Sequence, residues 1–198
     1  NLEYLKSQDV HLEQKISQNE IILQKWITEN KDSKLSSVIT IPVVVHVVYY
    51  NSTENISDQQ IQSQIDILNE DFRRQNSDTV NTPNGFQSVA VDCEIEFCLA
   101  TEDPSGNTTN GITRTQTSQS SFSTNNNVKY SSSGGIDAWN TTDYLNIWVC
   151  DLSGGLLGYA QFPGGTASSD GVVCDYAYFG NIGTASQPYD LGRTTTHE

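Results

Sequence analysis

The residues best suited to chemistry in this 198-residue chain are its three histidines and the acids beside them. Only His197 is followed directly by an acid, Glu198. An adjacent imidazole and carboxylate can open a metal site in which the acid serves as a base. Taken alone, such a pair is more often a solvated helix start, so it decides nothing without its context.

The other two histidines favour structural interpretations. His46 lies within a β-branched run, where a hydrogen-bonded core histidine is expected, and His11 lies on a polar helical segment. The sequence shows no Ser/His/Asp or Cys/His arrangement and no phosphate-binding glycine loop, and its glycine pairs are typical of turns. Nucleophilic catalysis therefore has no candidate residues.

The charge of the chain limits its partners. It carries 24 Asp and Glu against 10 Lys and Arg, which gives a formal net charge of −14. Such a surface repels phosphate backbones and anionic lipids, so we expect no nucleic acid and no membrane partner, and divalent cations are more natural. No apolar run approaches the ~20 residues that span a bilayer. The chain begins at Asn1, lacks methionine and opens with no signal-peptide pattern, so we expect sequence upstream.

Cysteine usage indicates the compartment. The four cysteines match no zinc pattern of the CxxC type: Cys93, Cys98, Cys150 and Cys174. With few lysines and abundant Asn, Ser, Thr and Gly, the composition favours a secreted, extracellular protein with one or two disulfides. Buried free thiols are an equal alternative, because pairing cannot be read from one sequence.

The first 50 residues divide into a helix, a linker and a strand. Residues 1–30 predict a helix, because apolar side chains recur at three- and four-residue steps. The polar stretch 30–37 (NKDSKLSS) breaks that pattern and predicts a linker exposed to proteases. The β-branched run 39–50 predicts a strand that is buried on both faces.

The next segment contains the best-specified helix of the chain. Ser57 is expected to be its N-cap and Gln60 the partner in a capping box. Residues 93–100 (CEIEFCLA) then predict a strand. A strand, a helix and a second strand in this order indicate a β-α-β crossover within a mostly parallel sheet.

The rest of the chain alternates loops and short strands. Residues 101–140 are rich in Ser, Thr, Asn and Gly, and little regular structure is expected there beyond a helical turn near residues 137–139. Strands are predicted at 144–152, 156–162 and 171–179. The second of these is bounded by glycine and proline turns, which favours an edge position. The tail 189–198 predicts the entry to a helix whose first turn the threonines cap.

The order of several segments is more informative than any one of them. They are IPVVVHVVYY, ISDQQIQSQIDILNEDFRRQ, EIEFCLA-TEDPSGN-TTNGITR, YLNIWVCDLSGGLLGYAQFPGG, DGVVCDYAYFG and LGRTTTHE. This succession, over residues 39–198, resembles the pappalysin family of metzincin metallopeptidases, particularly its cytophagalysin-like bacterial members. The block that begins YLNIWVCDL is the most specific part. Periodicity alone indicates only a mixed α/β domain.

The resemblance implies a fold and a domain organisation. The fold would be α+β, a metzincin-like N-terminal subdomain with a twisted, mostly parallel five-stranded sheet, one antiparallel edge strand and backing helices. Residues 1–35 would be the C-terminal part of a helical propeptide plus linker. Residues 36–198 would be the N-terminal subdomain of the catalytic domain, without its C-terminal subdomain. The enzyme would be a zinc endopeptidase, secreted as a zymogen, that acts on polypeptides and is inhibited by its own propeptide.

The resemblance also assigns the His-Glu pair. In the family motif HExxHxxGxxH, His197 would be the first zinc ligand, and Glu198 the general base that takes a proton from a zinc-activated water. The other ligands and the methionine turn would follow Glu198. One histidine cannot hold zinc against competing chelators, so the fragment alone is expected to be inactive. Family membership makes Ca²⁺ plausible, with no ligands assigned.

Substrate and propeptide contacts follow from the same resemblance. The family's edge strand above the zinc binds the substrate peptide by β-augmentation, and by position the contact residues would be Gly158, Tyr159 and Ala160. An ordinary structural strand is the alternative. A propeptide side chain, often a cysteine, blocks the zinc in latent members. Residues 1–35 contain no cysteine, so we expect it upstream, with Asp9 as the alternative.

A second function from another class fits part of the sequence. A non-enzymatic, acidic extracellular module that binds carbohydrate or calcium for adhesion would explain the negative charge and the Asn/Ser/Thr-rich loops. It would not explain the capped helix in a crossover position or the order of the segments.

Overall fold

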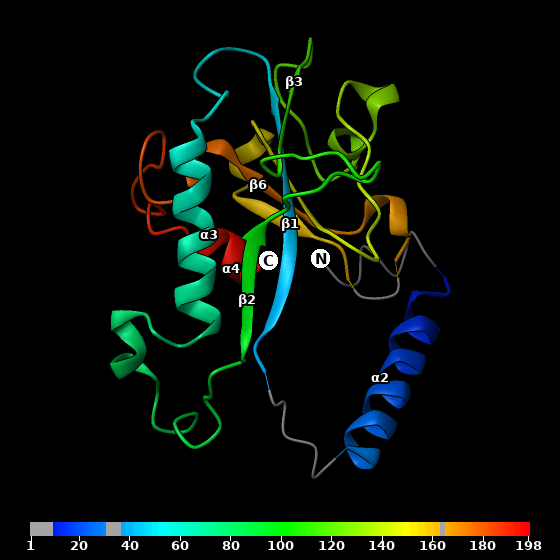
Figure 1. The fold of residues 1–198 in the computed structure, drawn as a ribbon, viewed down its shortest axis with the longest axis vertical. Coiled ribbons are helices and arrows are strands. Elements are labelled where there is room, and N and C mark those ends of the chain that lie inside the picture. The colour runs from blue at the N-terminus through cyan, green and yellow to red at the C-terminus, as the bar shows by residue number, and fades with distance from the viewer. Residues whose placement is uncertain (1–9, 31–36, 163–164) are drawn as a thin grey trace.

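The computed structural model describes residues 10–30, 37–162 and 165–198, which form one sheet with helices on both sides (Figure 1). The strands are β1 (Ile39–Tyr49), β2 (Ile95–Leu99), β3 (Ile112–Gln116), β4 (Leu145–Cys150), β5 (Gly158–Ala160) and β6 (Val172–Asp175). The α-helices are α2 (Leu12–Glu29), α3 (Asp58–Phe72) and α4 (Arg193–His197). Short 3₁₀ turns are η1 (Ser77–Asn81), η2 (Asn127–Lys129), η3 (Ser131–Ser133), η4 (Ser153–Gly155), η5 (Ala167–Ser169) and η6 (Tyr176–Tyr178).

The sheet has the predicted architecture. Its order is β2-β1-β4-β6-β5, and every neighbouring pair is parallel except β5, which runs antiparallel to β6 at one edge. These five positions confirm the α+β fold and the antiparallel edge strand. The strand count differs from the predicted five, because the sheet has six strands. The sixth, β3, runs along the second half of β1, beyond the half that β2 covers.

The loop-rich segment contains more structure than predicted. β3 lies within residues 101–140, and the helical turns of that segment are η2 and η3. The prediction of a helical turn near residues 137–139 is wrong, since these residues adopt none. β3 forms because it pairs with β1, and local composition carries no information about a partner strand that lies far away in the chain.

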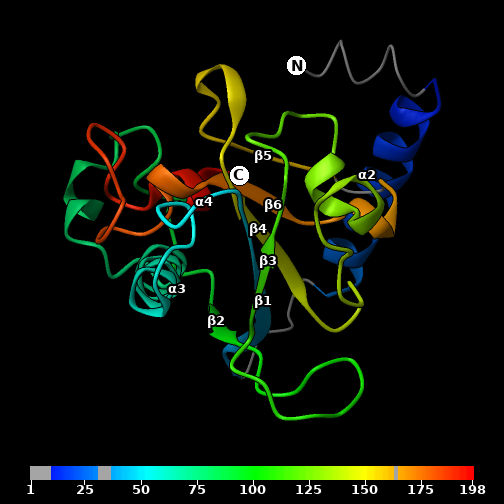
Figure 2. The same cartoon turned by 90° about the horizontal axis from the view of Figure 1, so that it is seen from above.

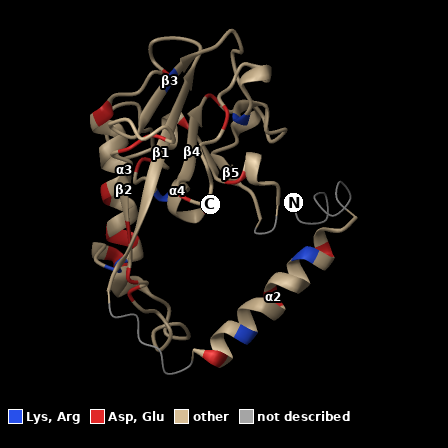
Figure 3. Cartoon of the chain, turned by 45° about the vertical axis from the view of Figure 1, so that its right-hand side comes forward, with Lys and Arg blue, Asp and Glu red and all other residues tan. Residues whose placement is uncertain are grey.

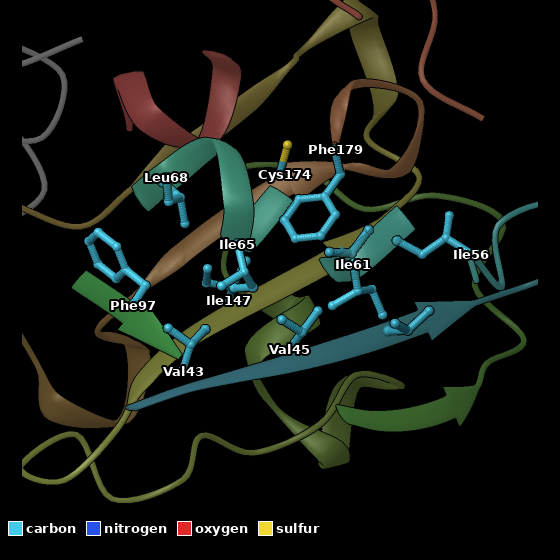
Figure 4. Packing of buried hydrophobic residues seen from close by; sticks show 12 residues of the cluster. Val43, Val45, Ile56, Ile61, Ile65, Leu68, Phe97, Ile147, Cys174 and Phe179 are labelled. Atoms are coloured by element: carbon cyan, nitrogen blue, oxygen red, sulfur yellow. The ribbon is translucent and has the colours of Figure 1, made fainter. Parts of the chain in front are cut away.

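β1 lies at the centre because both of its faces are buried. Val43, Val45 and Val47 join the core beneath α3, which also contains Ile61 and Ile65 (Figure 4). Alternate residues point to the opposite face. There a second core contains Val48 together with Trp148, Val173 and Tyr159. Viewed from above, α3 and α4 lie on one side of the sheet and the η2–η3 segment on the other (Figure 2).

The predicted helix cap is half confirmed. Ser57 is the N-cap of α3, and its hydroxyl accepts a hydrogen bond from the Gln60 N–H at 3.1 Å. The Gln60 side chain does not complete a capping box. It is buried, and it donates instead to the carbonyls of Tyr176 and Phe179. Its amide therefore anchors the segment after β6 onto α3.

Helix α2 confirms the N-terminal helix over residues 12–29 but stands apart from the cores (Figure 3). Leu12 is its only buried residue, and Leu23 and Trp26 are exposed. Asp9 and most of the predicted linker lie outside the described residues. No helix in the described part of the chain is long and apolar enough to cross a membrane.

The cysteines form no disulfide. Cys93 and Cys98 are exposed, whereas Cys150 and Cys174 are buried, and all four are free. The structure therefore does not support the predicted disulfide, and the alternative of buried free thiols holds for Cys150 and Cys174. Burial raises the pKa of both buried thiols, which keeps them protonated.

His46 is the hydrogen-bonded core histidine that its sequence context predicts. Its side chain is fully buried, with Nδ1 2.7 Å from the Thr113 hydroxyl and Nε2 3.0 Å from the side-chain oxygen Oδ1 of Asn146. Nε2 must donate to that oxygen, which leaves Nδ1 to accept from Thr113. Burial lowers the pKa of His46 to about 4, although the Asn146 hydrogen bond opposes this.

The buried neutral imidazole makes stability depend on pH. As pH falls from about 6.5 towards about 4, the unfolded chain binds a proton at His46 that the folded chain does not. The free energy of unfolding should therefore fall across this window, by an amount on the order of 3 kcal/mol. His46→Gln should flatten the profile between pH 6.5 and 5 in urea unfolding. An unchanged slope in that variant would contradict the prediction.

Candidate functional site

Helix α4, which ends in the His-Glu pair, is docked on α3 at its first residues. Its N-cap is Gly192, in the left-handed conformation with φ +67°. A Cβ on Gly192 would lie 2.5 Å from Cδ1 of Ile67, so only glycine allows this approach. The prediction that threonines cap the helix is wrong, because no side chain caps it. Thr195 and Thr196 hydrogen bond to α3 instead.

A single buried amide joins three segments at this point. Gln64 of α3 has no exposed surface. Its Nε2 donates to the Gly192 carbonyl at 2.9 Å, and its Oε1 accepts from the Gly180 N–H at 2.7 Å. The Thr195 hydroxyl donates to the same Oε1 at 3.2 Å. Gln64 thereby positions the start of α4 relative to the segment that follows β6.

An acidic side chain fixes the outer side of α4. The Asp71 carboxylate accepts a hydrogen bond from the Thr196 hydroxyl at 2.7 Å. Arg193 lies 3.2 Å from the same carboxylate and 3.0 Å from that of Asp78. The side chain of Asp71 is only 6% exposed, so the arginine compensates its charge.

The sequence interpretation missed these positioning residues. Gln64, Ile67 and Asp71 are three and four positions apart, which places them on one face of α3. That face borders the apolar stripe that packs on the sheet. In the sequence, polar side chains at such positions look like those of a solvent-exposed helix surface. The signal that could have revealed them is a buried face of α3 that is wider than one apolar stripe. A helix that packs against two neighbours buries such a wider face.

The edge strand lies directly against the end of α4. A Cβ on Gly158 would lie 3.2 Å from both Cγ of Glu198 and Cγ2 of Thr194. It would also lie 2.9 Å from the Val173 carbonyl oxygen. The structure thus brings Glu198 against Gly158, which lies forty residues earlier in the chain.

The His-Glu pair borders a hollow of about 260 Å³. His197 and Glu198 are exposed on its wall. The other lining residues are mostly apolar: Leu157, Pro188, Tyr189, Leu191, Arg193 and Thr194. Burial raises the pKa of the Glu198 carboxyl, and this is opposed by His197 and by a hydrogen bond from the Ala160 backbone.

The three predicted substrate contacts of β5 differ in their orientation. The Asp175 N–H donates to the Leu157 carbonyl, and Tyr159 pairs with Val173, so the ladder uses the backbone of alternate residues. The backbone groups of Gly158 and Ala160 therefore face away from β6, towards the open edge. The Tyr159 side chain lies in the second core and is 9% exposed.

The described residues fit a single zinc ligand. The exposed imidazole of His197 is a donor type that zinc prefers. No group of three or more His, Cys, Asp and Glu side chains among the described residues could hold a metal ion. His197 could therefore supply one zinc ligand, and these side chain types complete no metal site in the described part of the chain.

The buried amide gives a stability test with a matched control. Gln64→Leu leaves the Gly192 carbonyl and the Gly180 N–H without their partner, which should cost about 1–3 kcal/mol for each group. Gln62→Leu, two positions away on the exposed face of the same helix, should change stability by less than about 0.5 kcal/mol. Urea unfolding of both variants measures the difference. Equal midpoints would contradict the anchoring role.

Comparison with known proteins gives a consistent result. No family model and no curated protein matches the chain. Among solved structures, Tannerella forsythia mature mirolysin in complex with a cleaved peptide is 61% identical to it, with a TM-score of 0.79, over 83% of this chain and 62% of that one. Mirolysin in complex with a compound is 62% identical, with a TM-score of 0.78, over 82% and 62%.

The pro-form of mirolysin is similar to a larger share of this chain than the mature form is. A point mutant of Tannerella forsythia promirolysin is 53% identical, with a TM-score of 0.87, over 100% of this chain and 64% of that one. The chain therefore spans less than two thirds of the length of these relatives. It is similar over its whole length to the pro-form and over a smaller share to the mature form.

Proposed function

Because this chain belongs to the pappalysin family of metzincins, as mirolysin does, we propose that it is the N-terminal part of a secreted zinc endopeptidase. The parent protein would contain this chain together with the rest of the relatives' length, which is more than a third of it. The observation that carries the proposal is the 61% identity to mirolysin, a protein seen with a cleaved peptide. The contact between Gly158 and Glu198, with His197 alongside, supports it.

The proposed domain boundary falls near residue 35. Residues 1–35 would be the end of a propeptide with its linker, and residues 36–198 the N-terminal subdomain of the catalytic domain. Mature mirolysin covers 83% of this chain and promirolysin 100%, and residues 1–35 amount to about the difference. Neither hydrophobic core includes a residue of α2, as expected of a removable segment.

The residues of the chain have separate roles in the proposed reaction. His197 would hold the zinc together with ligands from the rest of the parent protein. Bound zinc would lower the pKa of water and polarise the scissile carbonyl. Glu198 would accept a proton from the attacking water and pass it to the leaving amine. With one ligand, residues 1–198 alone would be inactive.

The substrate would bind along the open edge of β5. Gly158 and Ala160 direct their backbone groups outward, and the Ala160 N–H already donates to the Glu198 carboxylate. An extended peptide could therefore hydrogen bond to Gly158 and to the Ala160 carbonyl as an added strand. Tyr159 would contribute through its place in the strand, since its side chain is buried on the other side. Polypeptides are therefore the proposed substrates, and the cleaved peptide bound to mirolysin supports this class.

Latency would depend on the propeptide. The similarity to promirolysin over the whole chain supports a protein that is secreted as a zymogen with its own propeptide as inhibitor. The comparisons favour this peptidase over the adhesion module, because the matched structures are those of mirolysin and its pro-form.

The base is tested in the parent protein. Glu198→Ala should leave zinc content unchanged, because the glutamate is not a ligand, and reduce peptide hydrolysis roughly 10²–10⁴-fold. Glu70→Ala, which removes an exposed acid from α3, should change neither quantity. Metal analysis and peptide hydrolysis measure the two effects. A Glu198→Ala protein with full activity would rule out the proposed base.

The contact between β5 and α4 gives a second test. Gly158→Ala adds a Cβ that must displace Glu198, Thr194 or the Val173 carbonyl, and an error of about 1 Å at a catalytic group can cost roughly 10²-fold in rate. Gly85→Ala adds a Cβ with no heavy atom within 4 Å and serves as the matched control. Peptide hydrolysis by the parent protein should fall only in the first variant. Equal loss in both, or in neither, would exclude this role of Gly158.

A further inference from the structure

A lysine is buried beneath the edge strand. Lys129, in η2, has no exposed surface. Its Nζ donates to the Ser169 carbonyl at 2.6 Å and lies 5.3 Å from the ring centre of Trp148 and 5.1 Å from that of Tyr159. No salt bridge joins it to another described residue. Lys129 is also the only lysine after residue 34, which sets it apart from solvating surface charge.

The two aromatic rings belong to a row of cross-strand neighbours. Trp148 of β4 pairs with Val173 of β6, and Val173 pairs with Tyr159 of β5. All three side chains lie in the second core. The ammonium group of Lys129 contacts both ends of this row and so connects β5 with β4 across the intervening strand. Such cation–π contacts are strongest where water is excluded.

Strand β5 has few other attachments. It consists of three residues, pairs on one edge only, and follows the glycine-containing turn η4. The connection back to β6 contains Ser169, whose hydroxyl donates to Gln161 just after the strand at 2.5 Å. Lys129 binds the carbonyl of this same Ser169. One side chain therefore holds both the strand and its return connection.

We propose that Lys129 is a positioning residue for peptide binding, which acts through Tyr159 and Ser169 to fix the outward backbone of Gly158 and Ala160. The inference rests on the proposed function. A hydrogen bond from an ammonium group and two ring contacts are directional, whereas an apolar side chain of the same length would only fill the volume. Substrate that binds as an added strand needs the edge backbone to be held in place before it arrives.

The charge of Lys129 is compatible with this role at neutral pH. Burial lowers the pKa of Lys129 to about 8, and the nearby Asp170 opposes the shift. The group is therefore mostly protonated at pH 7 in spite of its burial. The Ser169 carbonyl and the two rings offset the cost of desolvating the ammonium. Removal of the charge should therefore loosen the attachment of β5.

The first experiment measures peptide hydrolysis by the parent protein. Lys129→Met keeps an unbranched side chain that is one atom shorter and removes the charge, and it should raise KM roughly tenfold with kcat changed less than about twofold. Lys129→Arg keeps a cation and should recover most of the affinity. Tyr159→Leu removes one ring and should raise KM in the same direction. A Lys129→Met enzyme with wild-type KM, or with only kcat reduced, would overturn the inference.

The second experiment is independent of catalysis. Amide hydrogen exchange over residues 157–161 of the 198-residue chain should be roughly tenfold faster in Lys129→Met than in the wild type, with exchange in β1 unchanged. Uniform acceleration throughout the chain would indicate general destabilisation and overturn the positioning role. A wild-type parent protein that hydrolyses no peptide would refute the proposed function itself, whatever the exchange rates of the variants.

Discussion

Gln64 is buried in the face that α3 turns towards α4, and its amide satisfies a carbonyl, an N–H and a hydroxyl from segments more than a hundred residues further along the chain. A buried backbone group without a partner is costly, so these bonds strongly favour one placement of α4. The position of the His-Glu pair relative to the sheet depends on that placement. Gln60 performs the same task one turn earlier for the segment after β6.

The site is built where two independently held elements meet. α4 is held by α3, whereas β5 is held by β6 and, on the other side of the sheet, by the lysine–aromatic cluster of Lys129, Trp148 and Tyr159. Gly158 is the point of contact between them, and the absence of a side chain there lets Glu198 approach the strand. A change in the contacts that hold α4 or in those that hold β5 would alter the distance between the edge of β5 and the Glu198 carboxylate.

Neither hydrophobic core of the sheet, on which α4 and β5 are placed, uses the N-terminal helix. β1 buries both faces, one under α3 and one under the η2–η3 segment, and α2 adds no residue to either core. The part of the chain that contains the His-Glu pair therefore has its own hydrophobic interior. This organisation agrees with the proposed domain boundary near residue 35.

The sequence by itself determined the elements whose signal is local. The β-branched run specified a strand buried on both faces, Ser57 specified the start of α3, and the context of His46 specified a core histidine. Segment order further indicated the family and thereby the His-Glu pair. Only the tertiary structure decided the partners of Gln60 and Gln64, the pairing of β3, and the side of the sheet that Tyr159 faces. The physical reason is that periodicity and capping are properties of neighbouring residues, whereas hydrogen-bond partners and strand register depend on groups that folding brings together, and a shift of one residue in register reverses the direction of every side chain in a strand.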